Sequence, residues 1–66
     1  MNMSSHTGTA TQAQDLKPGQ RVLIGIDTKA ILNVTTKDGF TYLSLRMNGG
    51  RTAYRTFPAT RTLYTY

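Results

Sequence analysis

Short runs of alternating apolar and polar residues, separated by turns that contain glycine, make up most of the chain after residue 14. Alternation with a period of two is typical of half-buried strands, because it places the apolar side chains on one face. No segment keeps a helical period, and the twelve threonines favour extended structure. The pattern therefore predicts an all-β domain over 15–66. Its five antiparallel strands are expected at 21–26, 29–36, 40–47, 51–57 and 61–66.

Residues 1–14 carry no Lys, Arg, Asp or Glu and almost nothing bulky and apolar. Such a segment cannot offset the conformational entropy lost on ordering it. We therefore expect a disordered tail over 1–14, with order beginning at Asp15. His6 lies in this tail, where it is expected to be an incidental polar residue rather than a ligand or a base.

Proline and glycine mark the expected turns. Pro-Gly at 18–19 predicts a type II turn, because proline presets φ and glycine accepts a positive φ. A short connection is expected at 27–28, and one 3₁₀-like turn at 58–60. Gly25, inside the first predicted strand, indicates a bulge or a close backbone approach.

The Asp-Gly pair at 38–39 lies between two alternating runs and predicts a hairpin with a two-residue loop. This pairing makes one face wholly apolar and the other mostly polar, whereas a slip by one residue would mix them. The expected partners are Lys37–Phe40, Thr35–Tyr42, Val34–Leu43, Asn33–Ser44, Leu32–Leu45, Ile31–Arg46 and Ala30–Met47.

The Asn-Gly-Gly turn at 48–50 leaves two registers open. A two-residue loop directs Tyr54 to the core and leaves Arg51 and Arg55 outside. A three-residue loop with a bulge inverts this arrangement and would bury Arg55. Because an unpaired buried guanidinium is very costly, the two-residue loop is preferred. The resulting core consists of Val22, Ile24, Leu32, Val34, Leu43, Leu45, Tyr54, Phe57 and Leu63.

Composition limits the classes of function. A chain of 66 residues without cysteine has no disulfide and no thiolate metal site. One histidine, three aspartates and no Ser-His-Asp arrangement on ordered chain predict no catalytic residues, no metal and no cofactor. Without a long apolar run or a signal-peptide core, we expect a cytoplasmic protein without membrane association. A homodimer is compatible with this size but is not required by it.

The chain is strongly basic, with a formal charge of +5 and a pI of about 10.1. A positive surplus on a small surface favours nucleic acid as a partner, DNA or RNA, and next an acidic protein surface. The alternative interpretation is that the charge only maintains solubility.

Cations and an aromatic ring collect on the predicted outer face of the two hairpins. Guanidinium groups bind phosphate and rings stack on bases, so this face suits nucleic acid; an ordinary solvated sheet face is the alternative. The candidate binding residues are Lys37, Tyr42, Arg46, Arg51 and Arg55. Three further residues are candidates for a protein interface, namely Ile31, Tyr64 and Tyr66, although the two tyrosines could instead close the barrel.

Three segments carry a resemblance to a known architecture: Leu-Lys-Pro-Gly-Gln-Arg-Val at 16–22, Asp-Gly at 38–39, and Phe-Pro-Ala-Thr-Arg-Thr-Leu at 57–63. With five short strands and two tight hairpins, the chain resembles the Src-homology-three-like (SH3-like) small barrels, of which Tudor and KOW modules are similar in size. The resemblance is one of architecture and implies a five-stranded barrel. The expectation of a non-enzymatic binding module comes from the residues, because function does not follow from a fold. Such barrels are also similar to small phage accessory proteins, which implies the alternative of a protein-interaction module that modulates a host protein.

Overall fold

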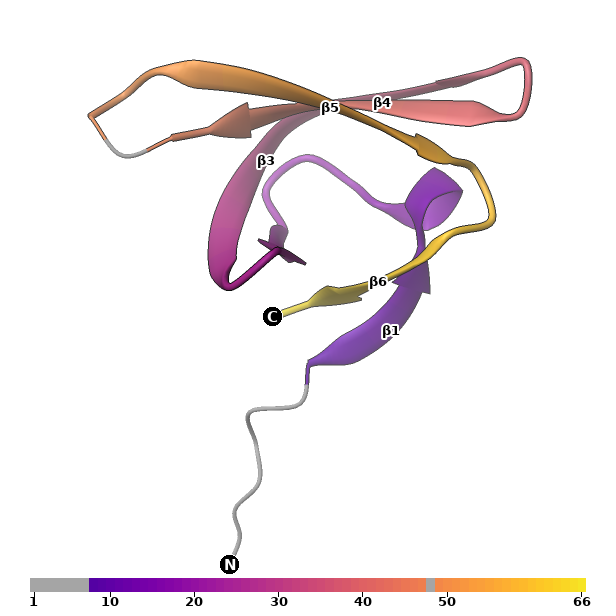
Figure 1. Ribbon diagram of the computed structural model, residues 1–66, viewed down its shortest axis with the longest axis horizontal. Helices are drawn as coiled ribbons and strands as arrows, with labels where there is room; N and C mark the ends of the chain where they lie inside the picture. Colours follow the sequence, from indigo (N-terminus) through magenta and orange to yellow (C-terminus); the bar gives the residue numbers. More distant parts are fainter. Residues whose placement is uncertain (1–7, 48) are drawn as a thin grey trace, which may run out of the picture.

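The structure is a computed structural model that describes residues 8–47 and 49–66. These residues form a six-stranded antiparallel sheet in the order β1-β6-β2-β3-β4-β5 (Figure 1). The all-β class is therefore confirmed, but the strands number six rather than five, and the sheet is open, with β1 and β5 at its edges. The strands are β1 (Thr9–Gln12), β2 (Arg21–Ile24), β3 (Asp27–Lys37), β4 (Phe40–Arg46), β5 (Thr52–Pro58) and β6 (Thr62–Thr65).

The additional strand, β1, lies inside the segment that was expected to be a tail. It pairs with β6 along its whole length and continues into the 3₁₀ turn η2 (Ala13–Asp15). Ala13 is fully buried, and its N–H donates to the Arg61 carbonyl at 2.9 Å. The prediction of a tail is thus wrong for 9–14, because this segment gains order from backbone pairing and a small buried side chain rather than from bulky apolar residues. Positions 1–7, His6 included, lie outside the described residues.

A two-residue turn joins β2 to β3. Ile24 pairs with Asp27, and Gly25 has a φ of 67°, which is the arrangement of a type II′ turn with glycine at its first central position. This corrects both the expected strand at 21–26 and the expected connection at 27–28. Ile26, expected to share a face with Val22, lies at the tip of the turn and is 95% exposed.

The Asp-Gly hairpin between β3 and β4 is confirmed near its turn. Asp38 and Gly39 both have positive φ, 54° and 83°, as a type I′ turn requires. Because the turn chemistry and the apolar pattern agree here, the register follows the prediction over the first part of the ladder. The confirmed pairs are Lys37–Phe40, Thr35–Tyr42, Val34–Leu43 and Asn33–Ser44.

A bulge in β3 changes the register beyond these pairs. Ile31 pairs with Leu45 and is 2% exposed, whereas Leu32 is the additional residue and is 40% exposed. β3 pairs with β2 at its start and with β4 further on, and a bulge lets a strand bend between two such partners. Ile31, a predicted interface residue, is therefore a core residue. The predicted pairs Leu32–Leu45, Ile31–Arg46 and Ala30–Met47 are wrong.

The second hairpin has the register that the sequence disfavoured. Arg46 pairs with Thr52, and the Met47 N–H donates to the Arg51 carbonyl at 2.7 Å. Met47 and Arg51 are thus the last hydrogen-bonded pair, and the loop between them has three residues, 48–50. Arg55 consequently lies opposite Leu43, on the core-facing side of the sheet. It is nevertheless exposed, because β5 is an edge strand and its side chain reaches water.

Two predicted turns are confirmed. At 17–20, Gly19 has a φ of 93° and the Gln20 N–H donates to the Lys17 carbonyl at 3.3 Å. Before β6, the Arg61 N–H donates to the Pro58 carbonyl at 2.9 Å, which forms the single turn. Both turns contain the residues whose local chemistry favours them.

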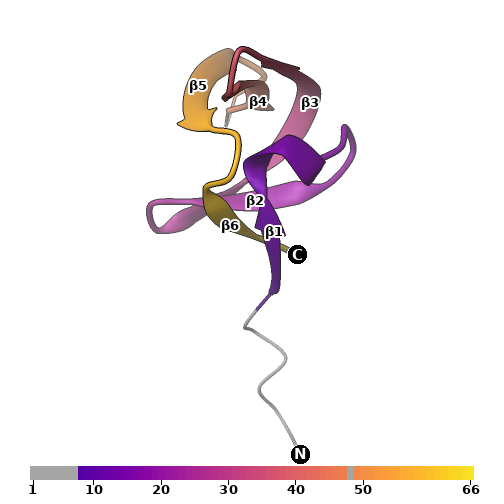
Figure 2. The same cartoon turned by 90° about the vertical axis from the view of Figure 1, so that its right-hand side faces the viewer.

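The core lies between the β3–β4–β5 part of the sheet and the β1–β6–β2 part (Figures 1 and 2). Of the predicted core residues, Leu32 and Tyr54 are exposed. No helix among the described residues is both long and apolar enough for a membrane span. The buried apolar residues are Ala13, Leu16, Val22, Ile31, Leu43, Leu45, Ala59 and Leu63, with Ile24, Val34 and Phe57 packed against them and partly buried.

Candidate functional site

The side of β3–β4–β5 that faces away from the core is called the outer face here. Leu43 and Leu45 of β4 point into the core, so the alternate residues of β4 and their cross-strand partners point outward. The outer face comprises Asn33, Thr35 and Lys37 of β3, Phe40, Tyr42, Ser44 and Arg46 of β4, and Thr52, Tyr54 and Thr56 of β5.

Three aromatic side chains lie together on the outer face and are open to solvent. Phe40, Tyr42 and Tyr54 are 46%, 47% and 71% exposed. Phe40 and Tyr42 are alternate residues of the middle strand. Tyr54 lies diagonally across from Tyr42, because Tyr42 pairs with Thr56 and Tyr54 is the preceding outward residue of β5. Diagonal neighbours about 7–8 Å apart remain within reach of aromatic side chains. The three rings thus form one aromatic group.

Two cations flank this group. Arg46 pairs with Thr52 and is therefore the diagonal neighbour of Tyr54, while Lys37 pairs with Phe40 at the opposite end of the face. Within residues 8–47 and 49–66, the cationic side chains that make hydrogen bonds or ion pairs are those of Arg21, Arg55 and Lys29. The charges of Arg46 and Lys37 are therefore available to an anion.

The predicted cluster of binding residues is only partly assembled. Lys37, Tyr42 and Arg46 share the outer face, but Arg55 lies on the opposite side of the sheet, and its Nη1 donates to the Tyr54 carbonyl at 3.0 Å. Arg51 precedes β5 and is exposed at the same end of the hairpin as Arg46. Correcting the register by one residue therefore exchanges Arg55 for Tyr54.

Tyr54 and Phe40 were not among the predicted site residues. Tyr54 was assigned to the core because the loop at 48–50 was expected to have two residues. The signal that could have found it was the Gly-Gly sequence of that turn, which suits a three-residue loop whose last residue takes a positive φ. Gly50 has a φ of 84°.

The remaining interface candidates, Tyr64 and Tyr66, belong to another surface. Leu63 and Thr65 of β6 are buried, so the two tyrosines point outward, at 45% and 50% exposure. We call the outward side of β1, β6 and β2 the second face. The Tyr66 ring lies against Gly8, where an added Cβ would come within 2.8 Å of its Cζ atom.

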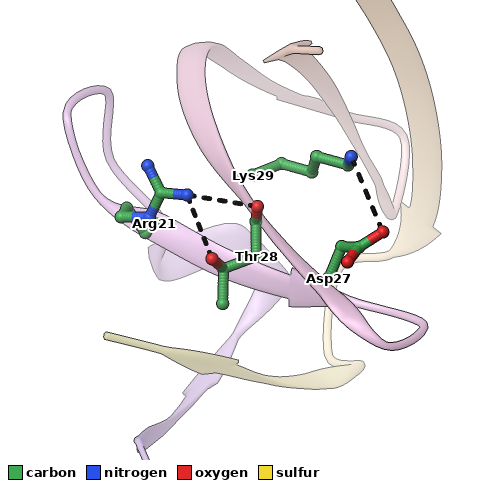
Figure 3. A network of polar contacts seen from close by, with 4 residues as sticks. All are labelled: Arg21, Asp27, Thr28 and Lys29. Carbon is green, nitrogen blue, oxygen red and sulfur yellow. Dashed lines mark hydrogen bonds and ion pairs between the residues drawn. The ribbon is translucent and has the colours of Figure 1, made fainter. Parts of the chain in front are cut away.

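The second face also contains an arginine, and its guanidinium is already bound. Nη2 of Arg21 donates to the Oγ1 of Thr28 at 3.0 Å and to the Thr28 carbonyl at 3.2 Å (Figure 3). Lys29, the next residue, points to the other side of β3, where its Nζ lies 4.0 Å from Oδ2 of Asp27. The Lys29 side chain is only 14% exposed. Both cations are therefore engaged within the fold.

The outer face is an open surface rather than a pocket. The described part of the chain encloses no cavity or cleft, and it contains no group of three or more His, Cys, Asp or Glu residues that could hold a metal ion. What this arrangement can do chemically is bind, through exposed cations, exposed rings and the hydroxyl groups of the surrounding threonines and serine.

In comparisons with known proteins, no family model, no curated protein and no solved structure matches this chain. Its function is therefore inferred from the residues of the outer face.

Proposed function

We propose that this protein is a non-enzymatic module that binds nucleic acid through its outer face. The observation that carries the proposal is that Arg46 and Lys37, with unneutralised charges, share one open face with three exposed aromatic rings. Cations neutralise phosphates and release counterions, and rings stack on bases. The net charge of +5 adds a long-range attraction for a polyanion.

The distribution of charge along β4 suits an elongated ligand. Phe40 and Arg46 are separated by six residues, which is about 20 Å along a strand. Lys37 is the cross-strand partner of Phe40, and Arg51 lies beyond Arg46 in the following loop. A nucleic-acid strand that lies along β4 would thus meet a cation at each end and the aromatic group between them.

A salt titration tests this proposal. Binding of a random-sequence oligonucleotide is followed by fluorescence anisotropy from low to physiological salt. Two to three phosphate contacts predict that log K falls with log salt with a slope of about −1.5 to −2.5. Absence of binding at low salt, or an affinity that does not change with salt, would rule the proposal out.

Arg55 offers a matched control for Arg46. Both side chains are exposed, both belong to the β4–β5 ladder, and replacing either by glutamine removes one charge. The proposal requires Arg46→Gln to weaken binding more than Arg55→Gln, because only Arg46 lies on the outer face. Equal losses would mean that net charge alone drives binding.

We also propose that the fold is an SH3-like small barrel of the Tudor or KOW type, to which β1 is an addition. Support comes from the five consecutive strands β2 to β6, from their tight hairpins, and from the one-turn break before β6. Deletion of residues 1–12 tests this idea, because a barrel built from β2 to β6 should keep its β-sheet circular dichroism and unfold cooperatively. Loss of the fold would show that β1 is an integral strand.

A second candidate function, a protein-interaction module, is favoured by the free edge of β5. The bond from the Met47 N–H to the Arg51 carbonyl sets the alternation of the ladder, so the odd-numbered residues of β5 bond to β4. The even-numbered residues direct their backbone N–H and C=O groups away from β4, so an extended segment of a partner could pair with them as an additional strand. Slowed hydrogen exchange at these amides in a complex would identify such strand addition. These outward backbone groups belong to Thr52, Tyr54 and Thr56, and among them the Tyr54 carbonyl already accepts a hydrogen bond from Nη1 of Arg55.

A further inference from the structure

We infer that the nucleic acid bound by the outer face is single-stranded, with unpaired bases stacked on Phe40, Tyr42 and Tyr54. This inference rests on the proposed function and deepens it by naming the class of substrate. It is carried by the spacing and the exposure of the three rings.

The spacing of the rings does not match that of stacked bases. Phe40 and Tyr42 are two residues apart on one strand, which corresponds to about 6.8 Å. Successive bases of one strand in a B-form duplex are about 3.4 Å apart. Neighbouring rings can therefore each take a base only if the bases are separated from one another, as they are in single strands bound by proteins.

A duplex also fails to present the surface that these rings need. Within a duplex the faces of the bases are covered by their neighbours, and the major groove admits a helix or a two-stranded ribbon that reads base edges. Here the rings stand on the middle and edge strands of the β3–β4–β5 part of the sheet. Their flat faces have nothing to stack on in an intact double helix.

The rings do not serve the core. Tyr54 is 71% exposed, and neither Phe40 nor Tyr42 belongs to the buried cluster or to the residues packed against it. A single exposed apolar residue needs no explanation, but three neighbouring rings on one face form a patch that indicates a binding surface. Stacked bases would cover this patch.

The surroundings of the rings complete the site for a single strand. Arg46, the diagonal neighbour of Tyr54, is placed to bind a phosphate next to a base stacked on that ring. The hydroxyl groups of Thr35, Ser44 and Thr56 lie beside the rings and can accept or donate hydrogen bonds at exposed base edges. A polar rim and an aromatic centre are thus provided by the same three strands.

The test compares single strands with a duplex of equal length at one salt concentration. Oligothymidylate and oligouridylate are the single-stranded probes, and a blunt DNA duplex is the competitor. We expect either single strand to bind at least about tenfold more tightly than the duplex, since each stacked base contributes about 1–3 kcal/mol, which is about 5- to 150-fold. Quenching of tyrosine fluorescence should accompany binding of the single strand.

Variants assign the effect to the rings. Tyr54→Ala should weaken single-strand binding about 5- to 150-fold and leave duplex binding unchanged, whereas Tyr54→Phe, which keeps the ring, should retain binding. Tyr64→Ala, on the second face, is the matched control and should change neither affinity. Because Tyr54 is exposed, its variants should stay folded, and circular dichroism of each variant checks this.

The outcomes distinguish a failure of the base-stacking inference from a failure of the proposed nucleic-acid binding. If single strands and duplex bind equally, or if Tyr54→Ala weakens both to the same extent, the inference of base stacking is overturned while nucleic-acid binding stands. If neither form binds at low salt, the proposed function itself fails.

Discussion

The outer face and the second face present similar side chains to solvent but differ in how these side chains are held. The outer face has Tyr42, Tyr54 and Arg46, and the second face has Tyr64, Tyr66 and Arg21. On the second face the guanidinium makes two hydrogen bonds to Thr28 and the ring of Tyr66 lies on Gly8. On the outer face, none of the described residues makes a side-chain hydrogen bond or ion pair to the guanidinium of Arg46.

This difference shows that residue type alone does not identify a binding surface. A guanidinium has five N–H donors, and at Arg21 those of Nη2 already donate to Thr28, so a ligand phosphate would find fewer free donors there. At Arg46 the phosphate replaces only water. The outer face is therefore the better candidate, and four experiments test the difference between the two faces.

The largest expected effect comes from removing the tyrosines of one face at a time. Tyr42→Ala with Tyr54→Ala should weaken binding of a single-stranded oligonucleotide by about 2–6 kcal/mol, because two stacking rings are lost. Tyr64→Ala with Tyr66→Ala should leave the affinity of the folded protein unchanged. Anisotropy titrations measure both, and an equal loss from the two double variants would abolish the distinction between the faces.

Ile31 lies in the core that both faces share. Ile31→Ala should lower the free energy of unfolding by about 2–5 kcal/mol, because it leaves a cavity around a side chain that is 2% exposed. Leu32→Ala, one position along, should cost less than about 1 kcal/mol, since Leu32 is 40% exposed. Urea denaturation compares the two variants. The reverse order would mean that β3 has no bulge at this position.

Substitution of Gly8 tests whether the contact between Gly8 and the Tyr66 ring stabilises the fold. Gly8→Ala combines a positive φ of 62° with a Cβ placed 2.8 Å from the Thr65 carbonyl oxygen, and should cost about 2–4 kcal/mol. Gly19→Ala is the control, because Gly19 has a φ of 93° but open space around it, and should cost only about 1–2 kcal/mol. Thermal unfolding measures the difference. Equal costs would show that the contact between Gly8 and Tyr66 contributes nothing to stability.

The smallest effect is expected from single arginines. Arg46→Gln should weaken binding about two- to fivefold and reduce the magnitude of the salt slope by about 1, as the loss of one phosphate contact implies. Arg21→Gln should leave the slope nearly unchanged and lower stability by about 0.5 kcal/mol, because it removes exposed hydrogen bonds to Thr28. A larger change of slope for Arg21→Gln would move the phosphate site to the second face.

The sequence was sufficient where the turn chemistry and the apolar pattern agree along the chain. Threonine content and alternation led to the all-β class, and the turn chemistry of Pro-Gly at 18–19 and Asp-Gly at 38–39 led to the correct turns. The Asp-Gly turn also determined that Lys37 and Tyr42 share a face, because the register follows directly from a two-residue loop. This part of the candidate site could be predicted.

Tertiary structure decided the rest. The bulge that buries Ile31 arises because β3 must pair with β2 and then with β4, and the position of Arg55 is tolerated only because β5 is an edge strand. β1 is a strand because β6 offers it an edge. These are relations between segments far apart in the chain, and no local pattern encodes them. They explain why the register of the Gly-Gly turn, which places Tyr54 rather than Arg55 beside Tyr42 on the outer face, is tolerated.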